Sequence, residues 1–128
     1  MRKLSLFVLF AVALTGFSFT SCEKEDVSKH TLIIRNWTLV SEKIAGTEQL
    51  NSGCERDNVW NFKSDKSYTI DPKVTCEDSE RLQVGVWSLN EDATVITLDD
   101  SEWDVTISAN EMVMRRSLIG IETVRTFK

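Results

Sequence analysis

Histidine and cysteine are scarce in this chain, and their scarcity limits the chemistry that the chain can carry out. The 128 residues include three cysteines and a single histidine, His30. A metal or redox site is not indicated, because the cysteines lack a Cys-x-x-Cys spacing and histidine ligands are missing. No Ser-His-acid spacing surrounds His30, and no acidic residue occupies an obviously buried position. We therefore expect no enzyme activity, no metal and no cofactor.

Basic residues are fewer than acidic ones, and they form no cluster. The chain has 15 Lys and Arg against 20 Asp and Glu, a formal net charge of −5. Binding to nucleic acid needs clustered cations against the phosphates, so we expect no nucleic-acid partner. The acidic residues of segment 99–104 do not have the spacing of a calcium-binding EF-hand loop, and alternation places Asp104 on the outer face. A solvated hairpin is the interpretation we prefer for this segment.

No apolar run in the chain is long enough for a membrane-spanning helix. The longest unbroken run covers residues 6–14, whereas a span needs roughly 20 apolar residues. The run follows Arg2 and Lys3 and leads to the small residues Ser18 and Ser21. A short basic region, an apolar core and small residues are typical of a secretory signal peptide.

The cysteine that ends this leader carries more information. Residues 19–22, with the sequence FTSC, resemble the lipobox of bacterial lipoproteins. The resemblance implies that residues 1–21 are a lipoprotein signal peptide that is removed, and that Cys22 becomes an acylated, palmitate-type N-terminus. Such acyl chains hold a small domain on a membrane. Ordinary signal cleavage, with a cysteine that is not modified, is the alternative.

Residues 22–29 are polar and predict a tether between the lipid and the domain. Glu25 and Asp26 follow Cys22 closely, as in the surface-export signal of lipoproteins from the Bacteroidota, which this segment resembles. The resemblance implies a cell-envelope protein of the outer membrane, exposed at the cell surface. A merely solvated linker is the alternative. Loss of the leader changes the net charge from −5 to −7, since it removes two basic and no acidic residues, so charge alone would not hold the domain on anionic lipid.

The other two cysteines, Cys54 and Cys76, would lie in an exported and oxidising compartment, where pairing is the default. A disulfide between them would stabilise the domain by about 3 kcal/mol through loss of entropy in the unfolded chain. A redox or metal pair is the alternative, although the spacing and the lack of histidines disfavour it.

Alternation of apolar and polar residues dominates the rest of the chain. A short helical turn is predicted within 27–35, with Ser28 as its cap. Most breaks between the alternating segments are short and rich in turn residues, which favours antiparallel hairpins. Eight strands with one apolar face predict an all-β domain over residues 30–128, a single eight-stranded antiparallel up-and-down barrel. The predicted strands are 37–44, 58–63, 67–71, 83–89, 95–98, 102–108, 112–117 and 121–127.

Several short motifs occur in a fixed order along these strands. They are Asn36-Trp37-Thr38-Leu39, Cys54, Trp60-Asn61-Phe62, Cys76 and Gly85-Val86-Trp87-Ser88-Leu89. In this order they resemble the lipocalin-like domains of Bacteroidota lipoproteins, over about the whole chain after the leader. The resemblance implies a lipocalin-like barrel whose base is closed by Arg125, from the last strand, stacked on Trp37. Such a contact contributes on the order of 1 kcal/mol. A ligand-binding role for Arg125 is the alternative.

A small eight-stranded barrel holds either its own side chains or one small ligand. We expect a small apolar or amphipathic ligand, and Arg116 would pair with the carboxylate of a fatty-acid-like molecule or lie solvated at the rim. The same side chains could instead fill the barrel, which would then bind a protein partner through loops 45–57 and 72–82. The candidate ligand-binding residues are Trp60, Phe62, Tyr68, Trp87, Trp103, Met112, Met114 and Arg116.

Overall fold

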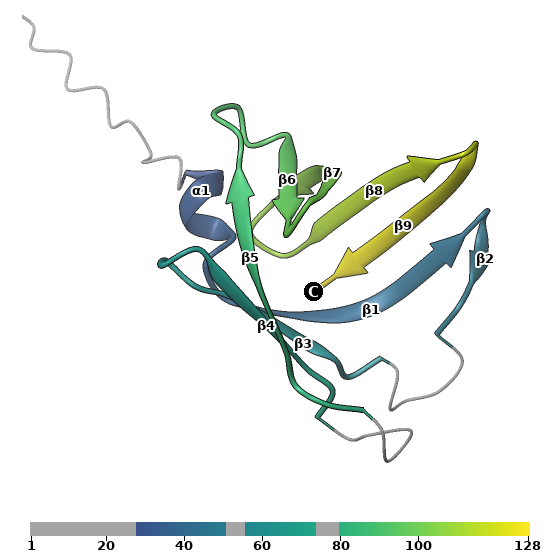
Figure 1. Cartoon of the computed structure of the whole chain (residues 1–128), viewed down its shortest axis with the longest axis horizontal. Helices are drawn as coiled ribbons and strands as arrows, with labels where there is room; N and C mark the ends of the chain where they lie inside the picture. Colours follow the sequence, from purple (N-terminus) through teal and green to yellow (C-terminus); the bar gives the residue numbers. More distant parts are fainter. Residues whose placement is uncertain (1–27, 51–55, 74–79) are drawn as a thin grey trace, which may run out of the picture.

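The computed structural model describes residues 28–50, 56–73 and 80–128, which form one antiparallel barrel (Figure 1). Cys22, Cys54 and Cys76 lie outside these ranges, so the acylation and the disulfide stay predictions. Within the described ranges no helix has both the length and the apolar character needed to cross a membrane. The elements are α1 Lys29–Leu32, β1 Asn36–Ile44, β2 Thr47–Glu48, β3 Val59–Phe62, β4 Ser67–Asp71, β5 Gln83–Leu89, β6 Val95–Leu98, β7 Ser101–Ile107, β8 Met112–Leu118 and β9 Ile121–Phe127.

The predicted fold class is confirmed. Each strand from β3 to β8 pairs antiparallel with the next along the chain, and β9 closes the barrel by pairing with β1. The eight long strands agree with the predicted ones to within one residue at each end. The short strand β2 was not predicted; it forms a hairpin with β1 through Ala45 and Gly46, whose φ angles of 50° and 80° suit a tight two-residue turn.

Besides its hairpin with β2, strand β1 pairs with two further strands because it is long and irregular. Its first residues, Asn36–Thr38, pair with β3, whereas the part from Leu39 to Ile44 pairs with β9. The register of the second pairing shifts between Leu39 and Ser41, as at a β-bulge. An extra residue at this point exchanges the inner and outer faces of the strand beyond it. The bulge therefore decides which side chains of β1 reach the barrel interior.

Helix α1 covers one end of the barrel. The hydroxyl of Ser28 accepts a hydrogen bond from the backbone N–H of His30 at 3.3 Å, which confirms Ser28 as the cap. The indole N–H of Trp37 donates to the carbonyl of Ile33 at 3.1 Å, and His30 Nε2 lies 2.9 Å from the carbonyl oxygen of Asn90. These contacts fasten the helical turn to β1 and to the turn between β5 and β6.

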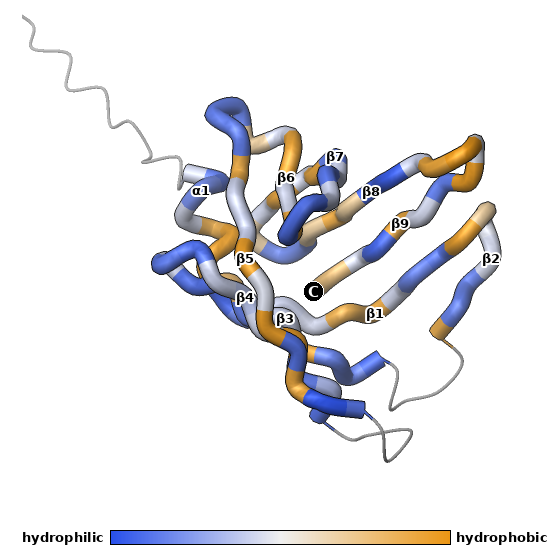
Figure 2. The backbone as a smooth tube through the Cα atoms, in the orientation of Figure 1, coloured by the Kyte–Doolittle hydropathy of each residue, from blue (hydrophilic) through white to orange (hydrophobic). Residues whose placement is uncertain are grey.

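The part of the interior next to α1, which we call the closed half, is filled by apolar side chains. Trp87 closes it from the β3–β4 side, since its indole N–H donates to the carbonyls of Lys63 and Ser67 at 3.1 and 3.0 Å. Hydrophobic residues also occupy the tip of the β8–β9 hairpin (Figure 2), but there Ile119 is fully exposed. The side chains of the closed half with no exposed surface are Ile33, Trp37, Phe62, Ile96, Met112, Met114 and Phe127.

The predicted stacking of Arg125 on Trp37 is wrong. The guanidinium carbon of Arg35 lies 3.8 Å from the centre of the Trp37 ring and takes this position instead. Register explains the difference, because Arg125 pairs with Glu42, and Glu42 lies roughly 16 Å along β1 from Trp37 at about 3.3 Å per residue. The arginine that covers the first-strand tryptophan thus precedes the barrel in the chain.

Candidate functional site

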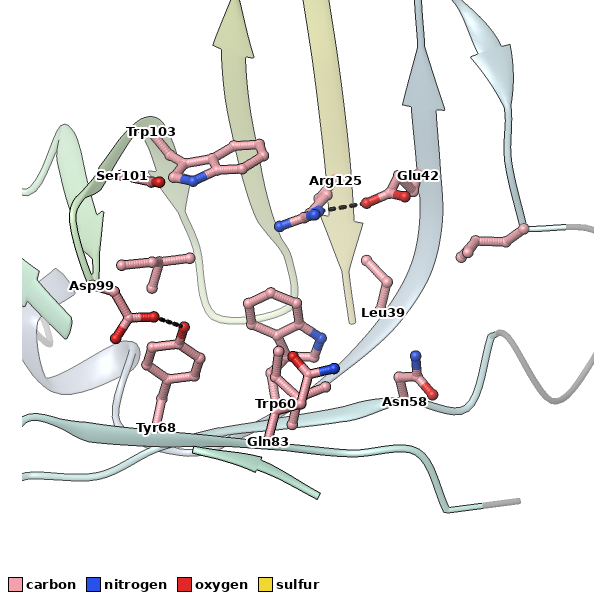
Figure 3. A pocket seen from close by; sticks show the side chains of 13 residues that line it. Leu39, Glu42, Asn58, Trp60, Tyr68, Gln83, Asp99, Ser101, Trp103 and Arg125 are labelled. Atoms are coloured by element: carbon pink, nitrogen blue, oxygen red, sulfur yellow. Dashed lines mark hydrogen bonds and ion pairs between the residues drawn. The ribbon is translucent and has the colours of Figure 1, made fainter. Parts of the chain in front are cut away.

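A cavity of about 380 Å³ occupies the end of the barrel away from α1 (Figure 3). We call it the mouth cavity. It lies where β1, β3, β4 and β5 diverge from β7 and β9, so its wall combines side chains from strands far apart in the chain. Among the described residues its lining consists of Leu39, Glu42, Leu50, Asn58, Trp60, Tyr68, Ile70, Gln83, Leu98, Asp99, Ser101, Trp103 and Arg125.

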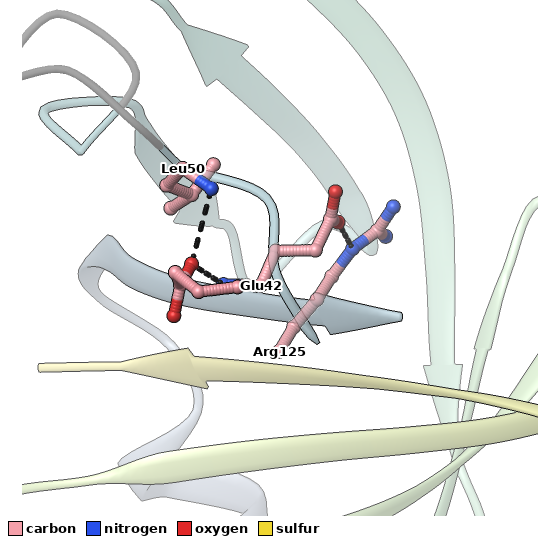
Figure 4. Close-up of polar contacts among 4 residues, drawn as sticks. Glu42, Leu50 and Arg125 are labelled. Carbon is pink, nitrogen blue, oxygen red and sulfur yellow. Dashed lines mark hydrogen bonds and ion pairs between the residues drawn. The ribbon is translucent and has the colours of Figure 1, made fainter. Parts of the chain in front are cut away.

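Arg125 extends over this cavity between two aromatic rings. Its guanidinium carbon lies 4.6 Å from the ring centre of Trp103 and 5.4 Å from that of Trp60. Arg125 Nε donates to Glu42 Oε2 at 2.5 Å (Figure 4), and the two side chains are only 25% and 21% exposed. The Nη groups have no acceptor among the described residues. Arg125 therefore has a neutralised charge but donors that are still available to a ligand.

A second polar pair lies on the other side of the cavity. The hydroxyl of Tyr68 donates to Asp99 Oδ2 at 2.8 Å, and the backbone N–H of Val86 donates to Asp99 Oδ1 at 3.0 Å. Burial and the hydrogen bond to Asp99 raise the pKa of Tyr68 to about 12. The hydrogen bonds from Val86 and Tyr68 hold the pKa of Asp99 below its ordinary value. At neutral pH the cavity therefore contains a neutral phenol and an ionised Asp99.

Gly85 is what allows the ring of Tyr68 to lie in this place. The two residues are directly opposite in the β4–β5 pairing. A Cβ atom at residue 85 would come within 2.6 Å of Cε1 and Cζ of the Tyr68 ring, closer than any real contact. Within the segment Gly85-Val86-Trp87, the glycine thus makes room for a ring of the cavity wall, whereas Trp87 packs in the closed half.

Glu48 holds the chain after β2 against the rim of the cavity. Its Oε1 accepts from the backbone N–H groups of Glu42 and Leu50 at 3.0 and 3.1 Å, and its Oε2 accepts from the hydroxyl of Ser41 at 2.5 Å. These hydrogen bonds, led by that from Ser41, lower the pKa of Glu48 to about 2. The arrangement places the buried side chain of Leu50 over the cavity.

Two polar atoms in the cavity wall are buried without a partner among the described residues. They are Nε1 of Trp60, whose residue is 5% exposed, and Oδ1 of Asn58. A buried donor or acceptor without a partner costs about 1–3 kcal/mol. In Figure 3 the indole nitrogen of Trp60 faces the side of the cavity where Asn58 lies. A ligand with its own acceptor and donor would remove this cost, as would ordered water.

The predicted ligand-binding residues divide between the two halves of the barrel. Trp60, Tyr68 and Trp103 line the mouth cavity. The other aromatic and methionine candidates do not line it, because they fill the closed half: Phe62, Trp87, Met112 and Met114.

Two positions were expected for Arg116, inside the barrel beside the methionines or at the rim, and the structure shows the rim. Strand β8 continues beyond its last pairing with β7, at Asp104 and Arg115, so Arg116 lies half-buried at the rim. Its guanidinium carbon is 5.5 Å from the Trp103 ring centre, and it borders a groove on the outside of the barrel. The arginine inside the mouth is Arg125.

Sequence reasoning missed Glu42 and Asp99. Alternation from Trp37 and Leu39 would point Ser41 inward, but the bulge in β1 turns Glu42 inward instead. Asp99 belongs to the turn between β6 and β7, where its φ of 51° is a conformation that Asp tolerates. In the sequence Asp99 cannot be distinguished from a solvated turn residue, because its partners Tyr68 and Val86 come close to it only in the folded barrel.

Metal ligation receives no support from the acidic segment 99–104. Asp99 is engaged by Tyr68 and Val86, whereas Asp104 is exposed on the outer face of β7. Within residues 28–50, 56–73 and 80–128, no three His, Cys, Asp or Glu residues are grouped so that they could hold a metal ion.

Comparison with known families supports the same architecture. Residues 33–114 match the model of the lipocalin-like domain family. The chain belongs to this family. The match extends from the end of α1 into β8. It therefore includes every described residue that lines the mouth cavity except Arg125. A search of curated proteins finds no match to the chain.

Proposed function

We propose that this lipocalin-like protein binds a small apolar or amphipathic ligand in the mouth cavity. The observation that carries the proposal is the cavity itself, whose volume of about 380 Å³ falls at the lower end of the range for ligand pockets. Its wall combines three aromatic rings with polar atoms that have no partner among the described residues. This combination of an apolar surface and a few convergent polar groups is usual in ligand sites.

A cavity-filling variant tests the proposal directly. Ile70→Trp places a large ring in the cavity wall, and Val84→Trp makes a similar change on the outer face of β5, where Val84 is 71% exposed. Titration calorimetry with uncharged aromatic and aliphatic probes should give saturable binding to the wild-type protein. Ile70→Trp should lower the affinity for these probes by about tenfold or more, which is 1.4 kcal/mol. Val84→Trp should leave the affinity unchanged. Absence of saturable binding for every probe, or equal binding by the two variants, would reject the proposal.

The protein is further proposed to be a non-catalytic lipoprotein of the Bacteroidota type, anchored in the outer membrane through acylated Cys22 and exposed at the cell surface. Ser28 and α1, the first described residues, lie at the end opposite the cavity, since α1 contacts Asn90 in the turn before β6 and the cavity is lined by Asp99 directly after β6. A tether attached there leaves the mouth accessible to solvent. Labelling with a palmitate analogue should modify the wild-type protein and not Cys22→Ser; labelling of both would argue against this anchor.

The disulfide between Cys54 and Cys76 and the binding of a protein partner also stay predictions. The central parts of loops 45–57 and 72–82, which would make both features, lie outside the described residues. Mass spectrometry of the non-reduced protein should find neither thiol free to react with an alkylating agent. Two alkylated cysteines in the native protein would instead favour the redox or metal interpretation.

A further inference from the structure

The charged side chains that line the mouth cavity do not favour the binding of an anion. Its described lining contains three charged side chains, Glu42, Asp99 and Arg125. Arg125 is already paired with Glu42 at 2.5 Å, and Asp99 receives hydrogen bonds but no cation. The formal charge of this lining is therefore −1, although an arginine lies at its centre.

A carboxylate in this place would add a third negative charge to a partly buried site. Like charges that share such a site raise one another's free energy, because the surroundings screen them less than bulk water does. A cationic ligand would meet the guanidinium of Arg125, which already occupies the space between Trp103 and Trp60. Neither sign of charge is favoured.

The cavity groups that lack partners would be satisfied by hydrogen bonds from a ligand, and a charge on the ligand is not needed for this. The Nη groups of Arg125 and Nε1 of Trp60 are donors without an acceptor among the described residues, and Oδ1 of Asn58 is an acceptor without a donor. A carbonyl oxygen accepts from either donor, and an amide N–H can donate to Asn58.

The shape of the wall selects for a flat molecule. The rings of Trp60 and Tyr68 are nearly parallel, with an angle of 6° and centres 5.9 Å apart, so they present one broad aromatic surface. The closed half is filled by Phe62 and Met114, neither of which has exposed surface. Among the described residues, the closed half therefore offers a long acyl chain no channel beyond the cavity.

We infer that the ligand is a small, flat, uncharged molecule with a carbonyl-type oxygen, and not a fatty acid or another carboxylate. The inference rests on the proposed function, since it specifies the ligand of the same cavity. The oxygen accepts from the Nη groups of Arg125, and the ring of the ligand lies against the surface formed by Trp60 and Tyr68.

A charge series on one ring system tests this in the wild-type protein. Naphthamide, naphthoate and naphthylmethylammonium share a ring and differ in charge, and palmitate adds a long-chain acid. Titration calorimetry at neutral pH should rank naphthamide first, by about tenfold over each of the others, which is 1.4 kcal/mol. The indole N–H signal of Trp60, assigned by its loss in Trp60→Phe, should shift when naphthamide binds.

Glu42→Gln should then remove the preference for naphthamide over naphthoate. The amide keeps an acceptor for Arg125 Nε but no longer neutralises the guanidinium, so the affinity for naphthoate should rise about tenfold while that for naphthamide stays within about twofold. Glu122→Gln is the matched control, because Glu122 pairs with Arg115 at 3.9 Å on the outer surface and changes the net charge equally. It should leave both affinities unchanged.

The outcomes separate the two proposals. Naphthoate or palmitate binding as tightly as naphthamide in the wild type, or no gain for naphthoate in Glu42→Gln relative to Glu122→Gln, would overturn the inference and leave ligand binding standing. Failure of these probes and of every other uncharged probe would overturn the proposed function as well. Melting temperatures of both variants near that of the wild type would show that the comparison concerns folded protein.

Discussion

At the α1 end of the barrel, Phe62, Met112 and Met114 have no exposed surface, whereas at the other end Glu42, Arg125 and their neighbours surround a cavity of about 380 Å³. The same strands build both ends, since β1, β8 and β9 each run from one to the other. The closed half thus supplies stability through apolar burial, and the mouth keeps its polar groups in pairs that leave room for a ligand.

The largest effect should come from emptying the closed half. Phe62→Ala should lower the free energy of unfolding by about 3–5 kcal/mol, because a fully buried ring leaves a cavity in a packed core. Ile70→Ala at the mouth should cost about 2 kcal/mol or less, since its side chain already borders a cavity. Urea unfolding followed by tryptophan fluorescence measures both. Equal costs would contradict the division of the barrel into two halves.

A smaller effect should follow from crowding the wall of the mouth. Gly85→Ala puts a Cβ atom within 2.6 Å of the Tyr68 ring, and the displaced ring should cost about 1–3 kcal/mol. The pKa of Tyr68 should also fall from about 12 towards its ordinary value as the hydrogen bond to Asp99 is lost. Gly85→Ala combined with Tyr68→Leu should cost less than the sum of the single changes, and strict additivity would show that the two residues are not in contact.

Alkaline pH should weaken the fold through the same tyrosine. Its pKa is about 12 in the folded protein against 10.0 ordinarily, so the fold favours the neutral phenol. This stabilisation is complete below pH 10 and is lost as the pH rises from 10 to 12. Tyr68 is the chain's single tyrosine, so the absorbance of phenolate reports it without ambiguity. Tyr68→Phe should lack this loss, and an ordinary pKa for Tyr68 would refute the buried hydrogen bond.

The smallest effect is expected at acidic pH and at the rim. Glu48 has a pKa of about 2 in place of 4.5, so its hydrogen bonds stabilise the fold above pH 4.5 and this contribution is lost as the pH falls towards 2. Glu48→Gln should flatten that part of the stability profile, whereas Glu102→Gln on the exposed face of β7 should not. Thermal unfolding across this pH range checks it, and identical profiles for the two variants would mean that Glu48 does not hold the rim.

Local patterns were enough for much of the fold. Alternation placed the eight long strands, and the turn residues between them implied antiparallel neighbours. Ser28 was recognised as a cap because its hydroxyl suits the start of a helix. Trp60, Tyr68 and Trp103 were recognised as candidates because they fall on the inner face of their strands.

Long-range register could not be predicted in the same way. The bulge in β1 carries no local signal, yet it turns Glu42 inward and so gives Arg125 a partner in the mouth. A stacked arginine was expected on Trp37, but the choice between Arg35 and Arg125 depends on which residues β9 places opposite β1.

By itself, then, the sequence determined that this chain is an all-β protein with eight long antiparallel strands and an aromatic inner face. Those properties depend on alternation and turn chemistry, which act over a few residues. Only the tertiary structure decided that one half is solid and the other hollow, and that Arg125 lies between Trp60 and Trp103. Packing and pairing between distant strands set these features. At a different strand register, the same residues would divide differently between the closed half and the mouth of the barrel.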